Sequence, residues 1–363
     1  MAGIPLVSVC IVTGRRAALL DACLVSLLGQ RDAPEFEVLV CSDGDPGVAG
    51  TVHRRFPNAR VCHVERALPG AARNLLVRRA RGDVLLFLDD DVTVDPSMLA
   101  HLARLAAAYP RVAVFGGPNE SPPSSTRFQF VQGAVLASIV GSGPVRRRYG
   151  AHPAGPADER FFTLCNLAVR RDAMVPFDHE LLCAEENDLL SRMSDAGVTM
   201  HYDPELVAYH ERRATVRGFV RQMHKYGRGR GQLLVRRPRT ARPAHLAPSA
   251  LVVYGLASPA AATLAGPVVF APLVAYGAAV GVMSAWIART LQRPWEVPRA
   301  AALLTLLHVA YGTGVLRGAI SDRERVAEPV ARSWIDLTAE EERETVDVDL
   351  VALEQEEAVG DTT

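Results

Sequence analysis

Residues 83–91 read Asp83-Val84-Leu85-Leu86-Phe87-Leu88-Asp89-Asp90-Asp91, an apolar run followed directly by three carboxylates. Such a run predicts a strand buried on both faces, as at the centre of a parallel sheet, where ligands bind beyond the carboxyl ends of the strands. A divalent cation would relieve the repulsion between these carboxylates, and Mg²⁺ or Mn²⁺ usually shares its remaining ligand positions with phosphates. The alternative is an acidic turn that caps a helix near Pro96, a task that Asp95 could perform alone.

The sequence on both sides of this run alternates between strand and helix patterns between Leu6 and Phe115. This alternation is typical of the α/β class and predicts a doubly wound, mainly parallel sheet with helices on both faces. The expected strands are Val7–Thr13, Phe36–Cys41, Arg60–Val64, Val84–Leu88 and Val112–Phe115, and the expected helices are Ala17–Leu28, Gly70–Ala80 and Pro96–Ala108.

The pattern is less regular beyond Phe115. Pro118–Pro123 is expected to be a loop, and the Gly-, Pro- and Arg-rich segment Ser138–Pro156 is a candidate lid. The further expected elements are a strand at Leu164–Arg170, a helix from Glu185 to Ala196, a strand near Val198–Tyr202 and a basic amphipathic helix from Thr215.

The 363 residues carry no net charge, but the charges are unevenly distributed. The segment Arg212–Arg242 is rich in arginine, whereas Asp322–Asp361 is mostly acidic and is expected to be a flexible tail. The six cysteines show no CxxC pair or zinc-binding spacing, which predicts buried free thiols in a reducing compartment. The apolar run Leu6–Val12 is too short for a signal peptide, so the first half of the chain is expected to be cytoplasmic.

No charged side chain occurs between Arg242 and Arg289, an interval long enough for two membrane spans. The uncharged run Ala300–Leu316 could form a third span or a re-entrant helix. An arginine-rich segment ahead of an uncharged stretch fits positive-inside topology and indicates a cell-membrane protein. The alternatives are interfacial helices, since Ala, Gly and Pro make the region only moderately apolar, or a buried helical hairpin of a soluble domain.

Several segments, in order and spacing, resemble family 2 inverting glycosyltransferases of the GT-A fold. They are VSVCIVTGRRAALLDACLVSLLGQ (7–30), EVLVCSDGD (37–45), GAARNLLVRRARGDVLLFLDDDVTVDP (70–96), NLAVRRD (166–172) and AEENDLLSRMSDAGVTMHYDPELVAYHE (184–211). The resemblance implies a GT-A domain, with residues 1–117 as its nucleotide-sugar half and 118–241 as its acceptor half. Residues 242–320 would be apolar membrane-associated helices, and 321–363 the acidic tail.

By this resemblance, the first half of the chain binds the donor. Asp43 matches a residue that reads the base and ribose, and Arg73 matches one that contacts the nucleotide, where its guanidinium could bind phosphate. Without the resemblance, Asp43 could equally belong to an Asp-Gly turn and Arg73 to a solvated helix face. Thr13, Asp89 and Asp90 are implied donor contacts. Asp89 and Asp91 fill the acidic positions of the DxD motif, and the implied ligands of the divalent cation, Mg²⁺ or Mn²⁺, are Asp91, Asp89 and His210.

The resemblance also implies residues for catalysis. Glu186 matches the base that activates the acceptor hydroxyl, with Glu185 and Asp188 as alternatives, although Asp188 could instead pair with Arg192 along the helix. His210 matches a histidine near the metal and diphosphate, and a structural histidine is the alternative.

Gln222–Arg228 is a degenerate copy of the QxxRW motif of processive synthases, which argues against a processive enzyme. Lys225 and Arg228 could still neutralise the leaving diphosphate, or this basic helix could contact anionic lipid headgroups. Gly14 and Ser42 depart from the family pattern, so the nucleobase stays open.

Together these features predict a metal-dependent, membrane-associated glycosyltransferase that acts on a glycan or polyprenyl-linked acceptor, similar to bacterial enzymes of the succinoglycan-synthesis type. The partners implied are a nucleotide-sugar donor, that acceptor and membrane lipid. A scaffold protein that binds sugar nucleotides without turnover is the alternative. Nucleic-acid binding is disfavoured, because the uncharged stretch next to the arginines points to lipid.

Overall fold

The computed structural model describes residues 5–14, 16–65, 67–321 and 333–336. Its main element is a nine-stranded sheet of order β12-β3-β2-β1-β4-β9-β6-β10-β8. The strands are β1 Val7–Thr13, β2 Phe36–Asp43, β3 Arg60–Val64, β4 Val84–Asp89, β6 Val114–Gly116, β8 Gly155–Ala157, β9 Leu167–Arg170, β10 Met200–Tyr202 and β12 Ser333–Asp336.

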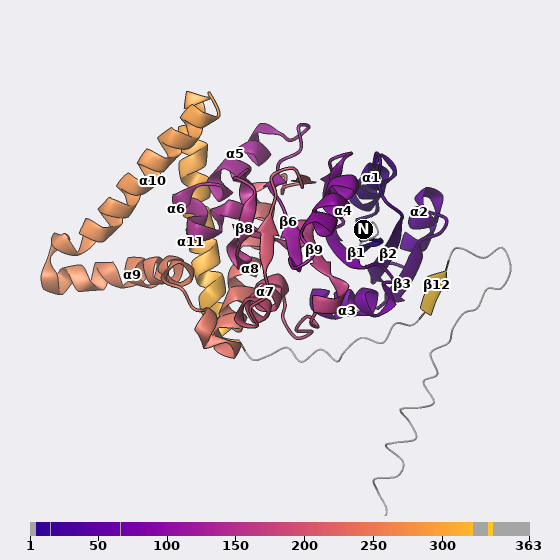
Figure 1. Cartoon of the computed structure of the whole chain (residues 1–363). Helices are drawn as coiled ribbons and strands as arrows, with labels where there is room; N and C mark the ends of the chain where they lie inside the picture. The colour runs from indigo at the N-terminus through magenta and orange to yellow at the C-terminus, as the bar shows by residue number, and fades with distance from the viewer. Residues whose placement is uncertain (1–4, 15, 66, 322–332, 337–363) are drawn as a thin grey trace, which may run out of the picture.

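Helices cover both faces of this sheet (Figure 1). Alternate residues of β1, β2 and β4 pack on one face against α1 (Ala17–Leu28), α2 (Val48–Arg55) and α4 (Met98–Ala108). The intervening residues pack on the other face against α3 (Pro69–Arg79) and α7 (Glu185–Asp195). Because β4 lies between β1 and β9 and is buried on both sides, its run of apolar residues is required, and the expected α/β architecture is confirmed.

The structure differs from the expected elements mainly after β4. The predicted strand Leu164–Arg170 begins as a 3-10 helix, Leu164–Asn166, because the Asn166 side chain bonds the carbonyl of Leu206 at 2.6 Å. The remainder, β9, runs antiparallel to both β4 and β6, so the sheet is mixed. The sequence analysis missed α2, α5 (Arg127–Leu136) and a small second sheet made of β5 (Val92–Val94), β11 (Ala208–His210) and β7 (Asn119–Glu120).

The candidate lid Ser138–Pro156 is largely helical. It contains α6 (Ile139–Ser142) and the 3-10 helix η1 (Gly143–Tyr149). The two halves expected at residues 1–117 and 118–241 share one sheet, so the division between them stays a prediction. All six cysteines are free and buried, as expected.

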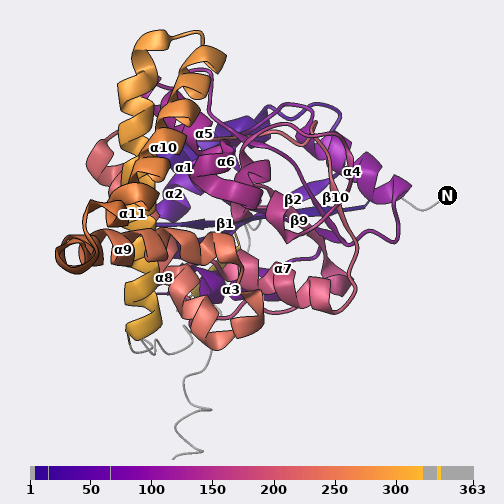
Figure 2. The same ribbon diagram turned by 90° about the vertical axis from the view of Figure 1, so that its left-hand side faces the viewer.

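Four long helices form the C-terminal part: α8 (Val216–Arg236), α9 (Pro243–Ala265), α10 (Ala271–Thr290) and α11 (Val297–Ile320). By length and apolar composition three segments could cross a membrane, Pro243–Ala265, Pro267–Thr290 and Pro294–Ile320. A bent pair, Arg127–Leu136 with Ile139–Tyr149, passes the same test as a possible fourth. The helices α9 and α10 project from the rest of the molecule, whereas α11 packs along α8 (Figures 1 and 2).

Glycines allow α8 and α11 to approach closely. A Cβ atom at Gly227 or Gly231 of α8 would lie 2.1–2.2 Å from backbone oxygens of α11, and one at Gly314 or Gly318 would lie 2.0–2.3 Å from those of α8. We call these four residues the glycine seam. Through these contacts α8 packs along α11, and the contact of its basic residues with lipid headgroups stays a prediction.

The predicted acidic tail, residues 321–363, lies mostly outside the described residues. Ser333–Asp336 is the described exception beyond Ser321, and it pairs antiparallel with β3 at the edge of the sheet.

Candidate active site

The acidic triplet lies in the turn between β4 and β5, at the carboxyl end of the central strand. It is not needed as a helix cap, because Asp95 accepts from the backbone N–H of Ser97 at 2.9 Å ahead of α4. Asp90 and Asp91 share Arg16 as an ion-pair partner, but the three carboxylates otherwise differ in burial and contacts.

Asp90 is completely buried and is not part of the cavity described below. Its carboxylate accepts a 2.7 Å hydrogen bond from Thr13 at the end of β1 and forms an ion pair with Arg16. Burial raises the pKa of Asp90, although Arg16 and Thr13 act in the opposite direction. These contacts join β1 to β4, so a structural role explains Asp90 better than the direct donor contact expected from the sequence.

Asp91 lies among cationic side chains. One carboxylate oxygen is 3.2 Å from Nε2 of His210, and the other is 2.5 Å from Arg16 and 3.3 Å from Arg213. Burial alone would raise the pKa of Asp91, but the charge and hydrogen bond of His210, with both arginines, hold it well below its usual range. Asp91 is therefore ionised at neutral pH and available to a cation.

The side chains at this edge could bind a divalent cation only together with ligands from a bound molecule. Within the described ranges, no three His, Cys, Asp or Glu side chains converge as a metal site. Asp91 and His210 together supply a carboxylate oxygen and an imidazole nitrogen, and Nδ1 of His210 is buried without a partner. Mg²⁺ and Mn²⁺ are commonly bound by one or two such groups plus substrate phosphates, so these residues could hold the cation of a nucleotide complex.

Arg73 connects the triplet to the start of α7. Its guanidinium donates to Asp89 at 2.9 Å and to Glu185 at 2.7 Å, and it is 5% exposed. Asp43, at the end of β2, accepts from the backbone N–H of Ala67 at 3.1 Å and faces the same space. The structure thus brings together Asp43, Arg73 and Asp89, which lie far apart in the sequence.

The three candidate bases at the start of α7 have different environments. Glu185 is 5% exposed and tied to Arg73; burial raises its pKa, and Arg73 lowers it. Asp188 is completely buried and paired with Arg192 at 2.9 Å and with Arg237, away from the cavity. Glu186 faces the cavity, with Arg148 at 3.4 Å and the side-chain amide of Asn187 at 2.6 Å. Its position is the one best suited to meeting a substrate.

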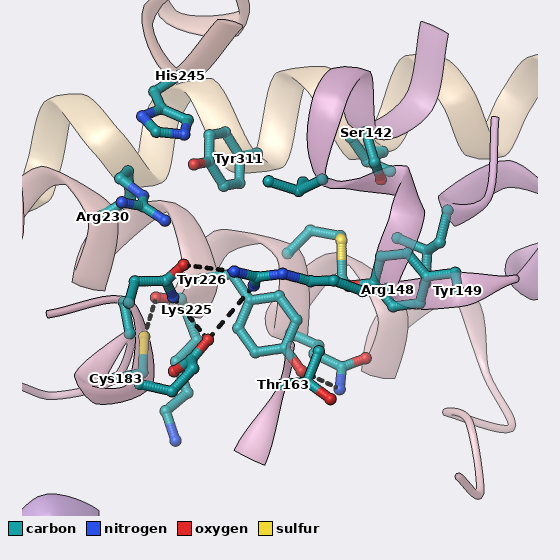
Figure 3. Close-up of a pocket in the computed structure, with 18 of the residues that line it drawn as sticks. Ser142, Arg148, Tyr149, Thr163, Cys183, Lys225, Tyr226, Arg230, His245 and Tyr311 are labelled. Atoms are coloured by element: carbon teal, nitrogen blue, oxygen red, sulfur yellow. Dashed lines mark hydrogen bonds and ion pairs between the residues drawn. The ribbon is translucent and has the colours of Figure 1, made fainter. Parts of the chain in front are cut away.

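A single cavity of about 1370 Å³ joins these groups to the apolar helices. Its walls include Thr13, Asp43, Arg73, Asp89, Asp91, Glu185, Glu186, His210 and Lys225. Arg228 and Asp188, both candidates from the sequence, are not in its walls. The opposite wall comes from α6, η1, α9, α10 and α11, and Figure 3 shows the region between the two, where Arg148 lies close to the carboxylates at the start of α7.

Several polar residues of this cavity were missed by the sequence analysis: Arg16, Arg148, Arg213 and Arg230. Each belongs to an arginine-rich stretch, so no single one stands out from its neighbours in the sequence. A signal was nevertheless present, because Arg16 lies three residues after the end of the first strand, at the same sheet edge as the acidic triplet.

Known proteins resemble the N-terminal part of the chain, which contains the acidic triplet. Residues 8–174 match the family model described as glycosyl transferase family 2. Curated relatives include the pre-mycofactocin glycosyltransferase of Mycobacterium tuberculosis, 25% identical over 209 residues, and the succinoglycan biosynthesis protein ExoM of Rhizobium meliloti, 26% identical over 185 residues. These alignments cover 52% and 48% of this chain, and 40% and 55% of the relatives, so the chain spans about half the length of the curated proteins it matches.

A solved structure supports the same fold. The mannosyltransferase PcManGT from Pyrobaculum calidifontis, solved in complex with GDP-Man and Mn²⁺, superposes with a TM-score of 0.57. The two chains are 17% identical, and the superposition covers 88% of each. The expected GT-A fold is therefore confirmed, together with a C-terminal region of apolar helices that could span a membrane.

Proposed function

Because this chain carries a glycosyltransferase family 2 domain, we propose that it is a cation-dependent inverting glycosyltransferase that moves a sugar from a nucleotide donor to a glycan or lipid-linked acceptor at the membrane. The observation that carries the proposal is the continuous cavity. It has the Asp91–His210 pair at one end, Glu186 in its wall and apolar helices opposite. A donor and a membrane-bound acceptor could therefore meet inside one continuous cavity.

The donor would occupy the end of the cavity formed by β1, β2 and β4. Asp43 would accept hydrogen bonds from the base or ribose, and Arg73 would bind the nucleotide or orient Asp89, with Thr13 fixing the edge of β1 through Asp90. Lys225, and Arg228 by its charge, would favour an anionic leaving group. Asp91 and His210 would hold Mg²⁺ or Mn²⁺, as suggested by the Mn²⁺ bound in the mannosyltransferase relative, and the cation would stabilise the departing diphosphate.

Glu186 would act as the general base. It would take the proton of an acceptor hydroxyl as that oxygen attacks the anomeric carbon from the face opposite the diphosphate, which inverts the configuration. Glu186 lies in the first turn of α7, faces the cavity and contacts Arg148 at 3.4 Å. Glu185 is the alternative base, but its bond to Arg73 would first have to break.

The membrane region would consist chiefly of α9 and α10. Only 11% of the apolar stretch in each of these two helices is buried within the protein, whereas 50% of the apolar stretch in Pro294–Ile320 is buried. Exposed apolar side chains on them include Leu256, Leu264, Val274 and Val282. Since a monomeric protein in water rarely exposes such a surface, lipid is its expected cover.

The third span expected from the sequence fits less well. The helix α11 packs along α8, and β12, which follows α11, joins the same sheet as β3, which lies long before it in the chain. A chain that crossed the membrane along α11 could not return residues 333–336 to that sheet. We therefore place α11 and the sheet on one side, the cytoplasmic side according to the positive-inside rule, with α9 and α10 as the membrane hairpin.

The experiment that tests the function is a panel of UDP-, GDP- and dTDP-sugars incubated with membranes containing the protein. Released nucleoside diphosphate and labelled product are measured with and without EDTA. We expect turnover with one donor class, loss in EDTA, and loss in Asp91→Asn, because that change removes a charged ligand.

Glu186→Gln should lower the rate of sugar transfer by roughly 10²–10⁴-fold, as expected for loss of a general base, while donor affinity stays nearly unchanged. Glu185→Gln is the comparison variant: loss of transfer in Glu185→Gln but not in Glu186→Gln would move the base to Glu185. Full activity of Asp91→Asn in EDTA would contradict the proposal. Donor binding without product, for every donor and acceptor tested, would favour the scaffold alternative, which Gly14, Ser42 and Glu186 suggest.

A further inference from the structure

A second polar cluster, which contains two arginines, lies in the cavity between Glu186 and the apolar helices. It consists of Arg148 on η1, Arg230 on α8, His245 on α9 and Tyr311 on α11, which Figure 3 shows gathered around a common space. Arg148 is 7% exposed and Arg230 is 8% exposed. None of these four residues belongs to the donor end, and the four come from four different elements.

Two residues of this cluster, Arg148 and His245, have a buried nitrogen without a partner. Arg148 donates to the carbonyl of Glu159 at 3.0 Å and to the side chain of Asn187 at 2.8 Å, but its buried Nε has no hydrogen-bond partner. Nδ1 of His245 is also buried without a partner. The carboxylate of Glu159, which could have neutralised the cluster, is paired at 2.5 Å with Arg242.

Arg230 has no carboxylate partner among the described residues. Glu186 contacts Arg148 at 3.4 Å, whereas Arg230 is hydrogen-bonded to the neutral side chain of Tyr311. Both guanidinium groups line the same cavity beside His245, so two positive charges lie close to one place. A buried cation without a counter-charge is costly, and this cost is relieved when an anion binds.

We propose that this cluster is a subsite for the phosphate group of a lipid-linked acceptor, a conclusion that rests on the proposed function. Guanidinium groups bind phosphate oxygens in a fork geometry, and Arg148 and Arg230 offer two such groups. Because Arg148 contacts Glu186, a phosphate bound to Arg148 would lie near Glu186 and would hold the acceptor next to the proposed base.

The surrounding residues indicate that the anion carries an apolar chain. Beyond the cluster, the cavity wall is formed by Val140, Leu251, Leu273 and Leu307 from α6, α9, α10 and α11. The donor diphosphate has its own site at the opposite end, beside Asp91 and His210. An anionic head with a hydrocarbon tail, such as a prenyl phosphate, fits both parts of this wall.

Binding to the purified full chain in detergent tests the subsite. The probes are farnesyl phosphate, farnesol and inorganic phosphate, followed by tryptophan fluorescence or calorimetry. Farnesyl phosphate should bind at least about tenfold more tightly than farnesol or phosphate alone, because only it satisfies both the arginines and the apolar wall. Arg230→Gln should remove most of that preference, and Arg230→Lys, which keeps the charge without the fork, should fall between.

The matched control is Arg217→Gln, an exposed arginine on the same helix that lies outside the cavity wall and should leave all three affinities unchanged. Equal binding of farnesyl phosphate and farnesol, or an unchanged preference in Arg230→Gln with an intact melting temperature, would overturn the subsite. Phosphate binding as tightly as farnesyl phosphate would overturn the assignment to a lipid.

The two proposals fail in different ways. Donor turnover with no preference for the prenyl phosphate would remove only the subsite. A preference that depends on Arg230, without turnover of any nucleotide sugar, would remove only the proposed function.

Discussion

Gly227→Ala should destabilise the protein, because the glycine seam leaves no room for one methyl group. The added Cβ would lie 2.1 Å from the carbonyl oxygen of Tyr311, and that contact would have to open by roughly 1.3 Å to reach an ordinary 3.4 Å. The obstacle is backbone of α11 and cannot rotate away, so we take the upper end of the overpacking cost, about 3 kcal/mol.

Alanine also favours the helical state over glycine by about 1 kcal/mol, which leaves a net loss of about 2 kcal/mol. At about 2–4 °C per kcal/mol, the melting temperature should fall by about 4–8 °C. Thermal unfolding of the full chain in one detergent, followed by intrinsic fluorescence, measures this change. Donor turnover measured in parallel should fall as well, since α8 and α11 both line the cavity.

The matched control is Gly281→Ala on α10. It is the same substitution in an apolar helix, but no atom lies within 4 Å of the added Cβ. Its melting temperature should be unchanged or slightly higher. If Gly227→Ala melts at or above the wild-type temperature, or no lower than Gly281→Ala, the close contact between α8 and α11 is refuted.

Three further results are expected. Asp188→Asn should lower the free energy of unfolding by about 1–2 kcal/mol, because the buried carboxylate loses its charge while both partner arginines stay partly exposed. Nucleotide binding should persist. If binding is lost while stability is unchanged, Asp188 belongs to the nucleotide site. Burial raises the pKa of Cys183 to about 12, so the folded state favours the neutral thiol. The stability that this provides is present below the ordinary thiol pKa and is lost as pH rises through about 12. Labelling of Cys183 by a disulfide reagent should therefore be slow at pH 8, and rapid labelling of the folded protein at that pH would contradict this. The protein should resist alkaline carbonate extraction, and a cysteine reporter at residue 265 should be accessible from outside; access only from the cytoplasm would exclude the hairpin of α9 and α10.

Local patterns in the sequence were sufficient for the α/β fold around the acidic triplet. The run Val84–Leu88 identified the central strand because a strand buried on both faces needs apolar residues at every position. The uncharged interval after Arg242 likewise predicted α9 and α10, because a lipid-facing helix must be apolar along its length. Both predictions depend only on neighbouring residues.

Elements that depend on distant partners were missed. The strands β5, β7 and β11 contain two or three residues each and exist only because they pair with one another. The antiparallel direction of β9 could not be predicted either, since direction in a sheet depends on how the intervening chain returns. The glycines of α8 had no predicted role, because a glycine is needed there only when α11 lies against it.

The sequence by itself determined which carboxylates end the central strand, which residues begin α7 and which stretch is uncharged, because these are properties of adjacent residues. Only the tertiary structure decided what each charge does. It buried Asp90 and Asp188 in ion pairs, turned Asp91 and Glu186 toward one cavity, and left Arg148 there with an unused donor, Nε. The physical reason is that the role of a charged group depends on its burial and its nearest opposite charge, and both are supplied by residues far away in the chain.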